Sequence, residues 1–85
     1  MSQHLGIDGF ARDREDDEAI SQNIQSLFRT PNGKAVLSYL RSVTLDLVSG
    51  PNASDGELRH REGQRFIVAI IEKRIQHAQR MKDNG

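Results

Sequence analysis

The residues best suited to chemistry lie between Arg59 and Arg65, where bases, an acid and a glycine stand close together. Arg61 and Arg65 are four residues apart, so on a helix they share a face and present cations to phosphates or carbonyl oxygens. Glu62 lies three residues before Arg65, which is the spacing of a local ion pair. The interaction candidates are therefore Arg59, Arg61, Glu62, Gly63 and Arg65.

Gly63 is unusual because it falls inside a stretch with helical periodicity. A glycine in a helix interior costs roughly 1 kcal/mol relative to alanine, so a structural reason is expected. Either a neighbouring helix approaches closely or the helix kinks. Gly33 would serve the same purpose on a facing helix. If both glycines lie at one helix crossing, the two helices would approach unusually closely there.

The remaining polar residues indicate no catalytic, cofactor or metal site. The chain has no cysteine, which excludes disulfides and thiolate metal sites. His4, His60 and His77 are far apart and lack metal-ligand spacing; the latter two are expected on a solvated, polar face. Gly33-Lys34 lacks the upstream glycine of a phosphate loop, and the serines lack the glycine pattern of a nucleophile elbow. We therefore expect no enzymatic activity.

Length and charge distribution limit the size and the kind of domain that can hold these residues. Eighty-five residues suffice for one domain with a thin core. Of the first 28 residues six are acidic and two basic, while ten of the twelve bases follow, which suggests an acidic arm beside a basic body. The longest apolar run, Phe66 to Ile71, has six residues, far fewer than the roughly 20 of a membrane helix. No secretory signal or membrane contact is expected.

Two helices are predicted in the first half of the chain. Glu15 to Phe28 has apolar residues at helical spacing and acids in its first turn, where the helix dipole favours negative charge. Thr30-Pro31 suits the start of a second helix, which should run to Val48 and end before Gly50-Pro51. Its buried stripe is predicted to contain Val36, Leu37, Leu40, Val43 and Leu47.

A long third helix is predicted from about Gly56 or Glu57 to near Lys82, opened by a Ser54 capping box. Its apolar stripe contains Phe66, Ile67, Ile70, Ile71, Arg74 and Ala78. The first 14 residues show no sustained period, so a flexible arm is expected there. The predicted fold is all-α: a small three-helix domain over residues 15–83, built from a helical hairpin plus a long third helix, with a flexible N-terminal arm over residues 1–14.

One segment also resembles a known family. Residues 28–40 read FRTPNGKAVLSYL, and Glu-Gly-Gln-Arg follows at residues 62–65. This pattern resembles a family of short, largely uncharacterised helical proteins of short-tailed bacteriophages, encoded among head and DNA-packaging genes. The resemblance covers about Leu27 to Ile71 and leaves out the acidic first helix and the end past Ile75. It implies a fold signature made of Phe28, Thr30, Gly33, Val36, Leu37 and Leu40.

The resemblance implies a virion-associated or assembly protein. The expected function is a non-enzymatic role in head assembly, virion structure or packaging, through contacts with a phage structural or assembly protein or in a homo-oligomer, in the virion or the host cytoplasm. Arg65 is expected to reach carbonyls at the end of a neighbouring helix, oriented by Glu62. The alternatives are a nucleic-acid-binding module that uses the basic third helix, and an inhibitor of a host protein that uses the acidic arm.

Overall fold

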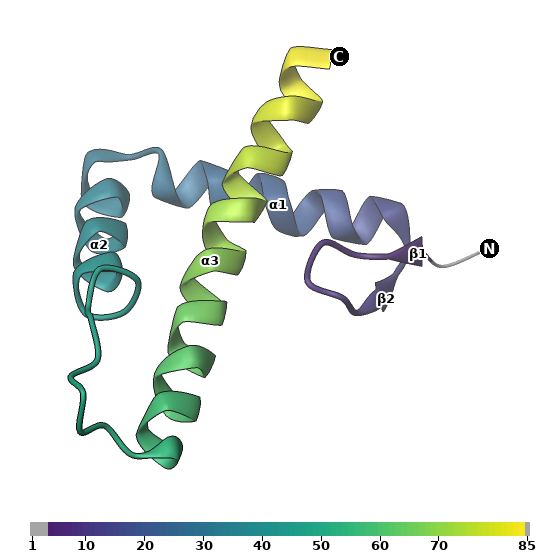
Figure 1. The fold of residues 1–85 in the computed structure, drawn as a ribbon. Helices are drawn as coiled ribbons and strands as arrows, with labels where there is room; N and C mark the ends of the chain where they lie inside the picture. The colour runs from purple at the N-terminus through teal and green to yellow at the C-terminus, as the bar shows by residue number, and fades with distance from the viewer. Residues whose placement is uncertain (1–3, 85) are drawn as a thin grey trace.

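The computed structural model describes residues 4–84, and these form three helices and one two-stranded sheet (Figure 1). The predicted mostly helical domain with a long C-terminal helix is confirmed. In chain order the elements are β1 His4–Leu5, β2 Ala11–Arg12, α1 Arg14–Phe28, α2 Pro31–Ser42 and α3 Asp55–Asn84.

The N-terminal segment differs from the flexible arm expected over residues 1–14. Residues 4–12 form a hairpin in which β1 and β2 pair antiparallel, while residues 1–3 lie outside the described part. Gly9 has φ 87°, and its amide donates to the carbonyl oxygen of Gly6 at 3.0 Å to close the turn. Two strands of two residues are not stable alone, so the hairpin depends on contacts with the helices.

Helix α2 starts at Pro31, as predicted, but ends at Ser42, well short of Val48. The Thr44 hydroxyl donates to the Leu40 carbonyl oxygen at 2.6 Å, and the Thr44 amide turns to the Arg41 carbonyl oxygen at 3.1 Å. A threonine hydroxyl that competes for helical carbonyls favours such an exit. The chain then returns through a loop to the start of α3 (Figure 1).

Helix α3 contains 30 residues and is therefore about 45 Å long. The hydroxyl oxygen of Ser54 accepts a hydrogen bond from the Glu57 amide at 3.1 Å, so the predicted capping of this helix by Ser54 is confirmed. Within residues 4–84, no helix has the length and apolarity together that a bilayer span requires.

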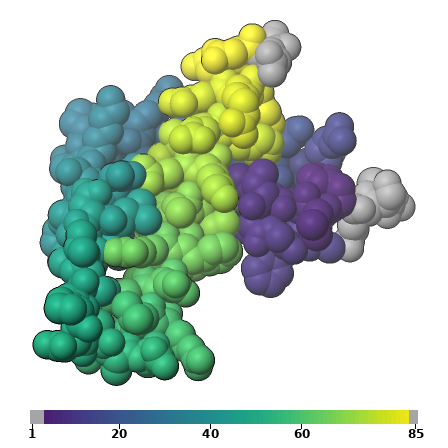
Figure 2. Space-filling model, in the orientation of Figure 1, coloured from purple at the N-terminus to yellow at the C-terminus, as the bar shows by residue number. Residues whose placement is uncertain are grey.

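The helices form an open, thin arrangement. Helix α1 crosses α3, α2 runs beside the first half of α3, and the hairpin packs on the other side of α3 (Figures 1 and 2). The molecule measures 48 × 33 × 16 Å, so its thin dimension is little more than one helix diameter. Among the described residues only Val68 and Ala78 are buried hydrophobics.

This thinness corrects the predicted apolar stripes. Phe66 and Ile67 are 54% and 59% exposed, and Val36 is 51% exposed. Because each helix has neighbours on only part of its circumference, a wide apolar stripe cannot be covered within one chain. These three side chains, predicted to lie in the buried stripes, are therefore on the surface.

Candidate interaction surface

Arg65 projects from α3 toward the end of α2. Its Nε donates to the Thr44 carbonyl oxygen at 3.1 Å, and its Nη2 donates to the carbonyl oxygen of Leu47. Helix α2 ends at Ser42, so both carbonyls belong to the turn that follows it, and the cationic fork of Arg65 reaches the two at once. Arg65 therefore contacts backbone carbonyls of the neighbouring segment, beyond the helix end at which they were expected.

The other interaction candidates are less engaged. The Arg61 Nη1 donates to the hydroxyl oxygen of Ser49 at 2.9 Å, which ties α3 to the incoming loop. Arg59 and Glu62 are exposed. Within residues 4–84 Glu62 makes neither a hydrogen bond nor an ion pair with Arg65, so the predicted orientation of Arg65 by Glu62 is wrong.

The two glycines do not share a helix crossing. A Cβ added at Gly63 would meet nothing within 4 Å, whereas one at Gly33 would overlap the Leu27 carbonyl oxygen and lie 2.7 Å from the Phe28 Cα. The predicted close approach at Gly63 is wrong, because this glycine lies on an open face of α3. The tight contact is instead between the start of α2 and the end of α1.

The predicted fold-signature residues form the junction of α1 and α2. The Thr30 hydroxyl accepts from the Gly33 amide at 2.9 Å and donates to the Leu27 carbonyl oxygen at 2.9 Å. It therefore caps α2 and closes α1 with one side chain. Of the apolar members, Val36 is exposed, and the others are half-buried: Phe28, Leu37 and Leu40.

An ion pair that the sequence did not indicate joins α2 to α3. The Arg41 Nη1 lies 2.6 Å from Oε1 of Glu72 and also contacts Oε2. The Glu72 side chain is only 28% exposed, so this pair is less screened by water than a free surface pair. It fixes the spacing between the two helices.

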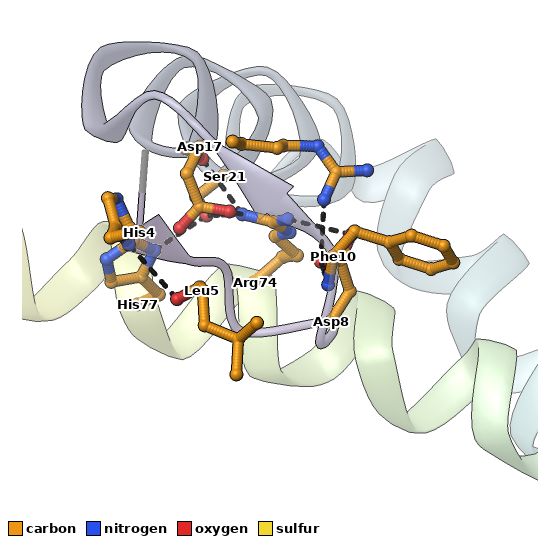
Figure 3. A network of polar contacts seen from close by, with 9 residues as sticks. His4, Leu5, Asp8, Phe10, Asp17, Ser21, Arg74 and His77 are labelled. Atoms are coloured by element: carbon orange, nitrogen blue, oxygen red, sulfur yellow. Dashed lines mark hydrogen bonds and ion pairs between the residues drawn. The ribbon is translucent and has the colours of Figure 1, made fainter. Parts of the chain in front are cut away.

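A buried polar cluster at the crossing of α1 and α3 holds the hairpin (Figure 3). The Arg74 side chain is 1% exposed, and its guanidinium lies 2.7 Å from Asp17 Oδ1 and 3.2 Å from Asp8 Oδ2. It also donates to the Asp17 carbonyl oxygen at 2.8 Å and to Ser21 Oγ at 3.0 Å. Asp17 Oδ1 lacks a hydrogen-bonded donor among the described residues, so its contact with Arg74 is coulombic.

Ser21 and His77 extend this cluster across the crossing. Ser21 Oγ lies 2.7 Å from His77 Nδ1, a distance that also occurs between nucleophile and base in hydrolases. Here Ser21 is fully buried, and its oxygen already accepts from Arg74, so it faces the interior. His77 is half-buried, which corrects its expected place on a solvated face. We call Asp8, Asp17, Ser21, Arg74 and His77 the crossing cluster.

Asp8 connects the hairpin to the crossing cluster. Partial desolvation raises the pKa of its carboxyl. Hydrogen bonds from the Phe10 amide and the Arg12 side chain, the charge of Arg12 and the contact with Arg74 lower it by more. The net effect is a pKa below the ordinary value. The Arg12 Nη1 lies 2.6 Å from Asp8 Oδ1. A Cβ on Gly6 would lie 2.6 Å from Asp17 Oδ1, so the hairpin also needs a glycine where it meets α1.

Sequence reasoning missed the crossing cluster because its members had been assigned to separate features. Asp8 was placed in the arm, Asp17 among the acids of the helix dipole, and Arg74 in the apolar stripe of the third helix. Arg74 was the available signal. An arginine at a core-facing position requires an acid or carbonyl partner, since a buried unpaired charge is too costly.

These features define a small helical protein whose contacts are organised along a long C-terminal helix. A family model described as Bbp19-like phage protein matches residues 24–82. The match spans more than half of the chain, so the chain belongs to the family of Bbp19-like phage proteins. The resemblance drawn from Leu27 to Ile71 is confirmed as one to a phage family, and the match also takes in the basic end past Ile75.

Comparison with curated proteins and with solved structures gives no match. The family match begins at residue 24, so it includes Arg74 but not the hairpin or the first half of α1. Asp8 and Asp17, which are the acidic partners of Arg74, therefore lie outside the matched segment.

Proposed function

We propose that this phage protein is not an enzyme and acts through protein–protein contacts, in head assembly, virion structure or DNA packaging. The distribution of apolar surface carries the proposal. Val68 and Ala78 are the buried hydrophobics of the described part, whereas eleven large hydrophobic side chains there are at least 39% exposed. Covering such a surface with another protein is strongly favourable, and surfaces of this kind mark interaction sites.

The proposed place of action is the virion or the host cytoplasm, with a phage structural or assembly protein as partner. Mass spectrometry of purified particles tests this directly, together with affinity purification of the tagged chain from infected cells. A fixed copy number in particles supports a structural role, and recovery with phage head or packaging proteins supports an assembly role. Recovery with a host enzyme alone would instead favour a host-directed inhibitor and overturn the proposal.

Nucleic-acid binding by the outer face of α3 is a second candidate. Arg59, Lys73 and Arg80 are exposed and are separated by multiples of seven residues, so they fall along one side of the helix. Phe66, 54% exposed, lies on the same line between the first two. Cations that meet phosphates and an aromatic ring that stacks on bases are the elements of a single-strand site.

A gel-shift titration across salt separates the two candidates. If α3 binds nucleic acid, the affinity falls steeply as salt rises, because phosphate contacts release counterions. Lys73→Glu combined with Arg80→Glu should then abolish the shift. Arg29→Glu combined with Lys34→Glu, two exposed positions outside α3, makes the same change in net charge and is the matched control. No shift at low salt would remove this candidate and leave the protein-contact proposal in place.

A further inference from the structure

A shallow groove lies between the end of α2 and the middle of α3. It has a volume of ≈ 460 Å³ and is lined by Leu40, Val43, Thr44, Gln64, Ile67 and Val68. Val68 is 4% exposed, while Val43 and Ile67 are 43% and 59% exposed. None of the lining side chains carries a charge. We call this surface the α2–α3 groove.

The chain exposes more surface than a closed monomer of its size. A folded protein of 9.6 kDa exposes about 5,100 Å² on average, whereas this chain exposes 6345 Å². The excess of about 1,200 Å² is larger than the roughly 800 Å² that each partner contributes to a standard interface. The open arrangement of the helices therefore leaves enough area for a full interface.

We infer that the α2–α3 groove is the two-fold interface of a homodimer, in which a second copy of the chain covers it with the same surface. This inference rests on the proposed function and names one partner for it. In a two-fold interface a patch meets itself, so a charge near the axis faces its own like charge. The uncharged groove satisfies this requirement.

A comparison with the outer face of α3 favours the groove. The outer face of α3 carries Arg59, Lys73 and Arg80, which would repel their own copies across a two-fold axis. The groove instead offers Gln64. Its amide nitrogen lies 3.1 Å from His60 Nε2, and its second N–H and its oxygen can pair with the same groups of its symmetry mate. Its floor, Val68, is already buried, so the partner needs to cover only the rims.

Substitution of two adjacent residues tests the interface. Ile67→Glu places like charges near the axis, whereas Phe66→Glu makes the same change on a side chain of similar exposure about 100° away around the helix. Sedimentation velocity on the full chain should show a wild-type dimer and a Phe66→Glu dimer. Ile67→Glu should weaken the dimer by at least about 100-fold, because like charges in an interface cost several kcal/mol.

Circular dichroism shows whether each variant is folded. A monomeric wild type at near-millimolar concentration, a folded Ile67→Glu chain that remains dimeric, or a loss of dimer confined to Phe66→Glu would overturn the inference. If Ile67→Glu fails to fold, cross-linking provides the test, since the chain has no native cysteine. Gln64→Cys should form a disulfide-linked dimer on mild oxidation, while Glu62→Cys, which points to another side of α3, should not. The reverse pattern would also overturn it.

The inference and the proposed function fail in different ways. A chain found in phage particles but monomeric in solution and unlinked by Gln64→Cys overturns the dimer and leaves the proposed function intact. A groove-mediated dimer that is recovered neither with particles nor with phage proteins supports the dimer and overturns the proposed function.

Discussion

The two contacts that α3 makes with the other helices are built in opposite ways. At the crossing with α1, one buried arginine joins carboxylates from two segments. Asp17, Ser21 and Arg74 of the crossing cluster are buried, and its other two members are half-buried. Beside α2, apolar side chains line an open groove, and the polar contacts of Arg41 and Arg65 stand at its edges. A buried ion pair needs every partner in place within the chain, whereas an apolar surface accepts a partner from outside. We therefore expect the crossing with α1 to contribute mainly to stability and the α2–α3 groove mainly to association.

The largest expected change in stability comes from a substitution at the crossing of α1 and α3. Arg74→Ala leaves the Asp17 carboxylate buried without its cation, and breaking a buried pair in this way costs about 3–5 kcal/mol. Small domains have a free energy of unfolding of roughly 5 kcal/mol or slightly more. We therefore expect the variant to be marginally stable, retaining about 2 kcal/mol or less, with a urea midpoint close to zero when unfolding is monitored by circular dichroism.

A double substitution is the matched control for that prediction. Arg74→Met combined with Asp17→Leu removes both charges and keeps the side-chain volume, a replacement that is often neutral for buried pairs. It should recover most of the loss seen with Arg74→Ala. A single Arg74→Ala variant as stable as the wild type would show that the crossing cluster does not hold α1 against α3.

The next largest change in stability is expected at Gly33, which sets the angle between α1 and α2. Because α2 forms one wall of the α2–α3 groove, this angle also sets the position of that wall. At Gly33→Ala the new methyl group would overlap backbone atoms of Leu27 and Phe28, which cannot rotate away. We expect a loss of about 1–3 kcal/mol, as for other overpacked sites. Thermal unfolding measures it.

Gly63→Ala is the control, because the same change there meets open space. An exposed helix-interior glycine replaced by alanine gains up to about 1 kcal/mol. The change in stability is therefore expected to have opposite signs at the two glycines. Equal effects would mean that the α1–α2 junction is not a tight contact.

A smaller effect is expected at the edge of the groove. Arg65→Ala removes the donors to the Thr44 and Leu47 carbonyl oxygens and should cost about 1–2 kcal/mol. Exposed Arg59→Ala should change stability by less than about 0.5 kcal/mol. Since the turn after α2 carries Val43 and Thr44 of the groove, Arg65→Ala should also weaken the dimer, and unchanged melting and assembly would contradict the role of Arg65.

The smallest expected effect is a pH dependence that the crossing cluster should show and the α2–α3 groove should not. The pKa of Asp8 is lower in the folded chain than in the unfolded chain, so its contribution to stability is complete above the unfolded value of about 3.9 and is lost as the pH falls through the folded value. The protection factor of the hairpin amides, which is the intrinsic exchange rate at each pH divided by the observed rate, should therefore fall in acid. Asp8→Asn should remove that part of the pH dependence, and dimerisation through the groove, which has no titratable lining, should not share it.

Local signals in the sequence were sufficient for much of the fold. The caps at Thr30 and Ser54 depend on side chains within three residues of their partners, so the starts of α2 and α3 were predictable. A contact of Arg65 with backbone carbonyls was also predictable, because an arginine fork can bind two carbonyl oxygens at once, although the carbonyls lie in the turn after α2. These features need no knowledge of how the helices are arranged.

The rest depended on contacts between distant residues. Arg74 meets residues more than 50 positions away, and a periodic pattern does not reveal which acid will lie opposite. The early end of α2 required knowing that Arg65 would bind the carbonyls of the following turn. The exposure of Ile67 could not be read from periodicity, because a stripe that faces a core and a stripe that stays on the surface have the same spacing.

The crossing cluster also bears on the order in which the chain folds. Its hydrogen bonds join residues separated by 53 to 66 positions, whereas the caps and the hairpin turn close over a few residues. Bringing together ends so far apart costs loop-closure entropy before any contact compensates for it, and non-local contacts of this kind slow folding. The α1–α2 junction can form early, but α1 and the hairpin reach their final positions only when α3 packs on α1 and Arg74 contacts its partners.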